Sequence, residues 1–152
     1  MRLFPSRIKH FFSPEENQRI VSAIREAERL TSGEVRVYVE SHCRFMDPVD
    51  RAIELFYGLK MEKTEQRNGV IVYIAIRDHQ LAVYGDEGIH QRVGEAFWKA
   101  EVRQMLNAFS AANHADGIIQ MVRHIGEALC EHFPYDTETD RNELPDEIVF
   151  GK

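Results

Sequence analysis

The chain has 152 residues, of which 43% are hydrophobic and 29% are charged. This composition is typical of a single globular domain and not of a disordered chain. The 19 basic and 25 acidic residues give a net charge of −6, which argues against nucleic-acid binding, because phosphate recognition needs a basic patch. The two cysteines are too few for a disulfide framework or a four-cysteine zinc site. We therefore expect free thiols and a cytoplasmic location. No apolar run approaches the roughly 20 residues that span a membrane.

The first predicted helix begins at Ser13, where Pro14 and Glu16 complete the pattern of a capping box. An apolar stripe at helical spacing continues to Leu30. Alternation of valine with polar residues over 34–40 then predicts a strand, and the spacing over 50–61 predicts a second helix.

The run over 70–76 is continuously apolar and rich in β-branched residues, which predicts a central strand that is buried on both faces. A short polar turn separates it from a further strand over 81–84. So short a link favours an antiparallel hairpin, whereas the strand over 34–40 should run parallel to the central strand.

The remaining chain predicts two long helices. Ile89, Val93, Phe97, Val102, Leu106 and Phe109 lie on one side of the first helix, and the second covers 115–133. The element order predicts an α/β fold, a three-layer α/β/α sandwich on a mixed, mostly parallel sheet.

Both ends of the chain differ from this domain, which we place at 13–133. Residues 1–12 form a basic and aromatic arm, predicted to pack on the domain; weak contact with a membrane surface is the alternative. Residues 134–152 form an acidic tail, with six acids and one base over 136–147. Its apolar last part, 144–150, is predicted to dock on the domain.

The predicted topology brings three polar loops to one end of the sheet, namely 32–34, 64–69 and 85–88. Their carboxylate and amide oxygens are ligands that suit Ca²⁺ or Mg²⁺. The candidate ligands are Asp86, Glu65, Asn68, Glu34 and Glu87, and the loops are shaped by Gly33, Gly69, Gly85 and Gly88. The alternative is that these side chains act only as helix caps and surface charge.

A second candidate is the loop over 41–47, at the carboxyl end of the first strand, where open α/β sheets bind ligands. His42 and Cys43 could hold a soft metal there, joined by Asp78 and His79 from the hairpin turn. An ordinary surface loop is the preferred interpretation.

The sequence contains no phosphate-binding glycine loop, no nucleophile elbow and no cysteine-phosphatase loop.

Three segments together resemble the TPM domain family. They are Ser32-Gly33-Glu34-Val35, Asn68-Gly69-Val70 before a strand, and Asp86-x-Gly88-Ile89-His90 at a helix start. The segments 109–117 and 142–146 resemble the family's loop before the last helix and the tail of its single-domain bacterial members. The positions that match the family pattern are Glu34, Thr64, Glu65, Asn68, Gly69, Asp86 and Gly88.

The resemblance implies an α/β/α sandwich, and for function it implies acid phosphatase activity, divalent-metal binding or membrane-complex maintenance. From these we expect a divalent-metal-binding module that interacts with a partner protein. The first alternative is an interaction domain without a ligand. The second is a metal-dependent phosphomonoesterase, with Asp86 and Glu65 as ligands and Arg67 offsetting phosphate charge.

Overall fold

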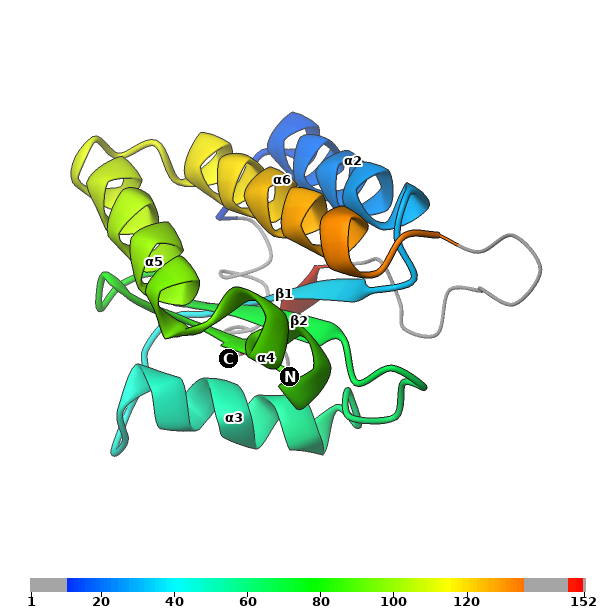
Figure 1. The fold of residues 1–152 in the computed structure, drawn as a ribbon. Helices are drawn as coiled ribbons and strands as arrows, with labels where there is room; N and C mark the ends of the chain where they lie inside the picture. Colours follow the sequence, from blue (N-terminus) through cyan, green and yellow to red (C-terminus); the bar gives the residue numbers. More distant parts are fainter. Residues whose placement is uncertain (1–10, 136–147, 152) are drawn as a thin grey trace.

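The computed structural model describes residues 11–135 and 148–151, and Figure 1 shows their arrangement. In chain order the elements are α2 (Pro14–Arg29), β1 (Glu34–Glu40), α3 (Pro48–Gly58), β2 (Gly69–Ala75), β3 (Gln80–Gly85), α4 (Glu87–Val93), α5 (Glu95–Ser110), α6 (His114–His132) and β4 (Val149–Phe150). Helices α2, α5 and α6 cover one face of the sheet, and α3 covers the other (Figure 1). The predicted three-layer α/β/α sandwich is confirmed.

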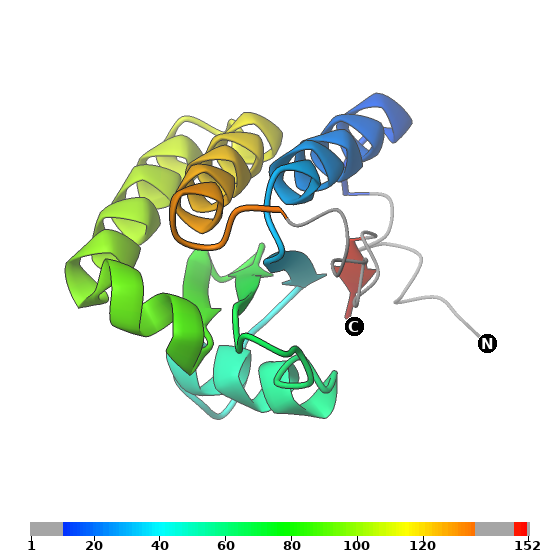
Figure 2. The same ribbon diagram turned by 45° about the vertical axis from the view of Figure 1, so that its right-hand side comes forward.

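The four strands are ordered β3-β2-β1-β4. β1 and β2 are parallel, with Glu34 opposite Gly69 and Glu40 opposite Ala75. β2 and β3 are antiparallel, and β4 is parallel to β1 at Tyr38 and Val39. Both the parallel unit and the hairpin predicted from the sequence are therefore confirmed. Figure 2 shows β4 at the side of the molecule away from α5.

The core consists of two layers of apolar side chains, one on each face of the sheet. The larger lies under α2, α5 and α6 and includes Ile20, Val72 and Ile125. The smaller lies under α3 and includes Phe56 and Tyr73. Every residue of β2 is buried, which explains why this stretch of the sequence is apolar without alternation.

Two helix predictions differ from the structure. The predicted single helix through 89–109 is wrong, because the chain breaks at Gly94, whose φ of 78° is a left-handed value that glycine adopts at little cost. Leu106, predicted on the apolar side, is 40% exposed. The helix predicted at 50–61 instead begins at Pro48, with the Asp47 side chain capping the Val49 amide, and ends at Gly58.

The structure describes part of each chain end. Phe12 is buried, and the Phe11 ring contacts the rings of Phe12 and His114. The tail returns as β4 alongside β1. Residues 1–10, 136–147 and 152 lie outside the described residues, so the membrane contact proposed for the arm and the docking of 144–147 stay predictions.

The carboxyl end of β1 forms a largely buried ion pair with α3. Glu40 is 6% exposed and accepts hydrogen bonds from Arg51 of α3, with Nε–Oε2 2.9 Å and Nη2–Oε1 3.1 Å. The Tyr73 hydroxyl also donates to Glu40. Burial, and then the contact with Glu40, raise the pKa of Tyr73. These hydrogen bonds connect α3 to the two central strands, β1 and β2.

Replacing the positively charged Arg51 of this buried pair should destabilise the fold. We expect Arg51→Met to lower the free energy of unfolding by about 2 kcal/mol, because it leaves the Glu40 charge buried without its main partner. Urea denaturation of wild type and variant measures this. The matched control is Arg29→Met, whose partner Glu26 is exposed and which should leave the midpoint unchanged. Equal effects of the two substitutions would contradict the assignment.

Candidate functional site

The three predicted loops meet at the amino ends of β1 and β2. The Glu34 amide donates to the Asn68 carbonyl at 3.4 Å, and the Asp86 amide donates to the Gly69 carbonyl at 2.9 Å. The Gly88 amide donates to the Arg67 carbonyl at 2.8 Å. These backbone bonds join all three segments, so their predicted convergence is confirmed.

Asp86 is the most constrained acid at this edge. Its side chain is 1% exposed and accepts two hydrogen bonds from Arg67, with Nε–Oδ2 2.7 Å and Nη2–Oδ1 2.9 Å. Oδ1 also accepts from the Glu87 amide at 2.8 Å, which caps α4. Such a two-pronged pair is among the stronger charge-assisted interactions in proteins, and it raises the pKa of Arg67. The buried anion is thus balanced by a cation from the next loop.

Arg67 also reaches Glu87, with Nη1–Oε1 2.8 Å. Its backbone has a φ of 52°, in the left-handed region, and 37% of its side chain is exposed. The guanidinium therefore covers Asp86 from the solvent side. The sequence predicts Arg67 only as a residue that offsets phosphate charge, because nothing in the sequence shows which loop side chain faces which.

Asn68 is buried beside this pair, and only some of its hydrogen-bonding groups have partners among the described residues. Its amide nitrogen donates to Ser32 Oγ at 3.2 Å, and its backbone amide donates to Thr64 Oγ1 at 3.3 Å. Its side-chain oxygen Oδ1 is buried and has no hydrogen-bond partner among the described residues. A buried acceptor without a donor is unfavourable, and a bound cation is one way to satisfy it.

The other candidate acids are arranged differently. Glu34 is buried, at 2% exposure, at the start of β1, whereas Glu65 is exposed on the loop before β2. Within the described parts of the chain, no three Asp, Glu, His or Cys side chains gather as a ready metal group. The loop cluster therefore brings Asp86, Glu87 and Arg67 into direct contact, and the proposed set of cation ligands remains a prediction.

Two of the loop glycines are required by close packing. A Cβ on Gly88 would lie 2.1 Å from the Gln66 carbonyl oxygen and 2.6 Å from that of Arg67. A Cβ on Gly85 would lie 2.4 Å from Cζ2 of Trp98. Gly88 thus lets the start of α4 press against the Arg67 loop, which fixes the position of Asp86.

The second candidate loop is held by Asp78. His42 Nδ1 lies 2.7 Å from Asp78 Oδ1, and the Cys43 amide donates to Asp78 Oδ2 at 2.7 Å. These contacts, His42 first, lower the pKa of Asp78. The His79 ring instead lies 6.2 Å from the ring of Phe109. Asp78 therefore joins the loop as a structural partner, as expected for an ordinary surface loop.

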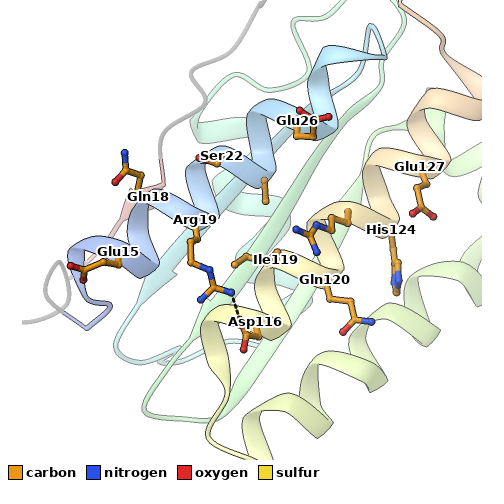
Figure 3. A pocket seen from close by; sticks show the side chains of 12 residues that line it. Glu15, Gln18, Arg19, Ser22, Glu26, Asp116, Ile119, Gln120, His124 and Glu127 are labelled. Atoms are coloured by element: carbon orange, nitrogen blue, oxygen red, sulfur yellow. Dashed lines mark hydrogen bonds and ion pairs between the residues drawn. The ribbon is translucent and has the colours of Figure 1, made fainter.

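Among the described residues, one groove lies within the helical layer and another lies along the outer edge of the sheet. The larger, of about 1030 Å³, runs between α2 and α6, and Figure 3 shows that the Arg19–Asp116 ion pair bridges it. Its other polar lining includes Glu15, Glu26 and Arg123. The smaller, of about 600 Å³, lies along β3 and is lined mostly by apolar atoms. Neither groove was predicted, since both depend on how the helices sit on the sheet.

Comparison with known proteins identifies the class. The sequence model of the TPM domain matches residues 7–128. This match spans most of the chain, and the chain belongs to the TPM domain family, as the sequence resemblance indicated. No functionally curated protein matches it.

Solved structures share the fold. The BA42 protein of the psychrophilic bacterium Bizionia argentinensis is 38% identical, with 96% of this chain and 99% of that chain covered and a TM-score of 0.86. The N-terminal domain of a P. gingivalis protein is 16% identical, with 84% and 83% covered and a TM-score of 0.68. The N-terminal domain of cg2496 from Corynebacterium glutamicum is also 16% identical, with 78% and 74% covered and a TM-score of 0.63. The last two show likeness of fold alone.

The described helices include none with the length and apolar character needed to cross a membrane. The expectation of a cytoplasmic location goes further than this and stays a prediction.

The role of Gly88 can be tested by adding one methyl group. Gly88→Ala should destabilise the domain by about 2–3 kcal/mol, because the new Cβ meets two backbone carbonyl oxygens that cannot move independently. Thermal and urea unfolding measure this. The control is Gly58→Ala at the end of α3, where a Cβ meets nothing within 4 Å and alanine should be neutral or stabilising. If Gly88→Ala is also neutral, the loop contact is not what positions Asp86.

Proposed function

We propose that this TPM domain binds a divalent cation, Ca²⁺ or Mg²⁺, and serves as a protein-interaction module. The cation is held by Asp86 and Asn68, with Glu34, Glu65 and Glu87 assisting. The observation that carries the proposal is the buried Asn68 Oδ1, which lacks a donor among the described residues, next in sequence to the Gly69 carbonyl that fixes Asp86.

The residues at this edge fit such an ion in their chemistry. Asp86 is a buried anion, and the remaining donors are oxygens of Asn68, of carboxylates and of loop carbonyls, which hard divalent cations prefer. Arg67 now supplies the positive charge that Asp86 requires. Because that side chain is partly exposed, it can move outward and leave its place to an ion.

An interaction domain without a ligand is the second candidate, and one observation favours it. The Arg67–Asp86 pair neutralises the buried carboxylate without any ion. The phosphomonoesterase alternative needs a metal-activated water, so it depends on the same cation binding and is tested after it.

The cation site is tested by an amide NMR titration of metal-stripped protein with Ca²⁺ and then Mg²⁺. We expect saturable shifts confined to residues 32–34, 64–69 and 85–88. Asp86→Asn should abolish them, because it removes the buried charge while retaining a side chain that can cap α4. The control is Asp47→Asn, which changes the exposed cap of α3 and should titrate like wild type. Unchanged affinity in Asp86→Asn, or no shifts at millimolar metal, would leave the ligand-free interaction domain as the function.

Because Arg67 and the ion compete for Asp86, replacing Arg67 should strengthen cation binding, whereas replacing Asp86 should abolish it. Arg67→Gln should lower the Kd for the cation about tenfold, because the binding-competent carboxylate no longer has to release an internal cation. Calorimetric titration measures it, with Arg77→Gln, which lies in the hairpin turn at the other end of the sheet, as the control. Weaker binding in Arg67→Gln would mean that Arg67 supports the ion's ligands instead of competing with it.

A further inference from the structure

The outer edge of β3 pairs with no further strand among the described residues. β3 ends the strand order on one side, whereas on the other side β4 pairs with β1. The Asp86 amide donates to the Gly69 carbonyl, so these two residues form a hydrogen-bonded pair. In an antiparallel ladder such pairs recur at every second residue. Residues 80, 82 and 84 therefore direct their backbone groups to β2, and Leu81, Val83 and Gly85 direct theirs outward.

This edge lacks the usual protection against pairing with another chain. Natural edge strands are commonly guarded by lysine, proline, a bulge or an inward charge. The segment Gln80–Gly85 contains no charged residue and no proline. It is also regular, since its register with β2 is unbroken from Gln80 to Gly85. A strand of this kind is a template for a further strand.

An apolar groove lies directly along this strand. It has a volume of about 600 Å³ and is formed by β3, by α5 and by the start of α3. Its apolar lining includes Val49, Leu81, Val83, Trp98 and Val102. A segment paired residue for residue with β3 would be about 20 Å long and would place alternate side chains against each of the two walls.

The charged side chains along the groove differ between its two ends. Trp98 packs on Gly85 and Phe109 contacts His79, so α5 runs antiparallel to β3. Arg103 therefore lies toward the Leu81 end, and it is exposed without an ion pair to any described residue. Glu87 and Glu95 lie toward the Gly85 end, where each already has a partner.

We propose that this groove binds an extended, apolar peptide segment of a partner protein, which adds to β3 as an antiparallel strand with an acidic residue at its carboxyl end. Antiparallel addition places that acid beside Arg103 and a basic residue near Glu87 and Glu95. Backbone hydrogen bonds from Leu81, Val83 and Gly85 provide affinity, and the apolar walls select the side chains. A second copy of this chain fits less well, because its own β3 carries α3 and α5 on its two faces.

The segment is identified by selection from a random octapeptide library displayed on phage, with the full chain as target. EDTA is present throughout, so the result does not depend on the cation site. The enriched octapeptides are then synthesised. We expect alternating β-branched or aromatic residues, with a basic residue first and an acidic residue last.

The binding mode is read from amide hydrogen exchange by NMR with these peptides. Exchange at Leu81, Val83 and Gly85 should slow at least about tenfold on binding, because their outward amides become hydrogen-bonded, whereas Ala82 and Tyr84 should be protected before binding. Arg103→Glu should weaken the selected peptides about fivefold. Arg123→Glu, an equally exposed change on α6, should not.

Four outcomes would overturn the proposal. The library yields no enrichment, or the selected peptides bind without slowing exchange at Leu81, Val83 and Gly85. Slow exchange without peptide that depends on protein concentration means that a second copy occupies the edge. Slow exchange that is independent of concentration means that the chain covers the edge itself.

Discussion

The pairing of β2 on its two sides is the constraint on which the rest of this structure depends. Its parallel pairing with β1 and its antiparallel pairing with β3 bring the start of β1, the start of β2 and the end of β3 to one edge. The β2–β3 pairing keeps the loops of Asn68 and Asp86 together, and the β1–β2 pairing adds the loop of Glu34 to them. The driving force is burial, because β2 is apolar on both faces and is covered by helices on each.

A buried carboxylate must have a counter-charge, and this requirement organises the edge. Asp86 serves three tasks at once, since it caps α4, continues the β3 pairing through its amide and anchors Arg67. The amide bond restrains the backbone of Asp86 and the other two contacts restrain its carboxylate, so the position of the residue is fixed before any ligand arrives. Preorganisation of this kind lowers the cost of binding. In the described structure the positive charge that neutralises Asp86 comes from Arg67, whose side chain is partly exposed; the proposed divalent cation would take over that role.

Patterns that depend on local backbone preference could be read from the sequence, and patterns that depend on side-chain packing could not. The capping box at Ser13, the apolar run of β2 and the tight hairpin each have a local cause, and together they determined the predicted topology. The sequence predicts Gly94 within a helix because its neighbours keep the apolar spacing, although its backbone, with a positive φ, ends that helix. The Arg67–Asp86 pair and the groove beside β3 arise from contacts between loops and layers, for which one sequence carries no signal.

The outer edge of β3 and the loop cluster are linked through a short stretch of chain. Gly85 ends β3 under Trp98, Asp86 follows in the proposed cation site, and Glu87 both contacts Arg67 and lines the groove. If a cation displaces Arg67, Glu87 loses the partner that now holds it at the mouth of the groove. The charge presented to a strand at the Gly85 end then changes. Cation binding and peptide binding are therefore expected to be coupled, and by linkage the coupling must be reciprocal. This gives a physical route by which the proposed cation would control the binding of a peptide to the groove.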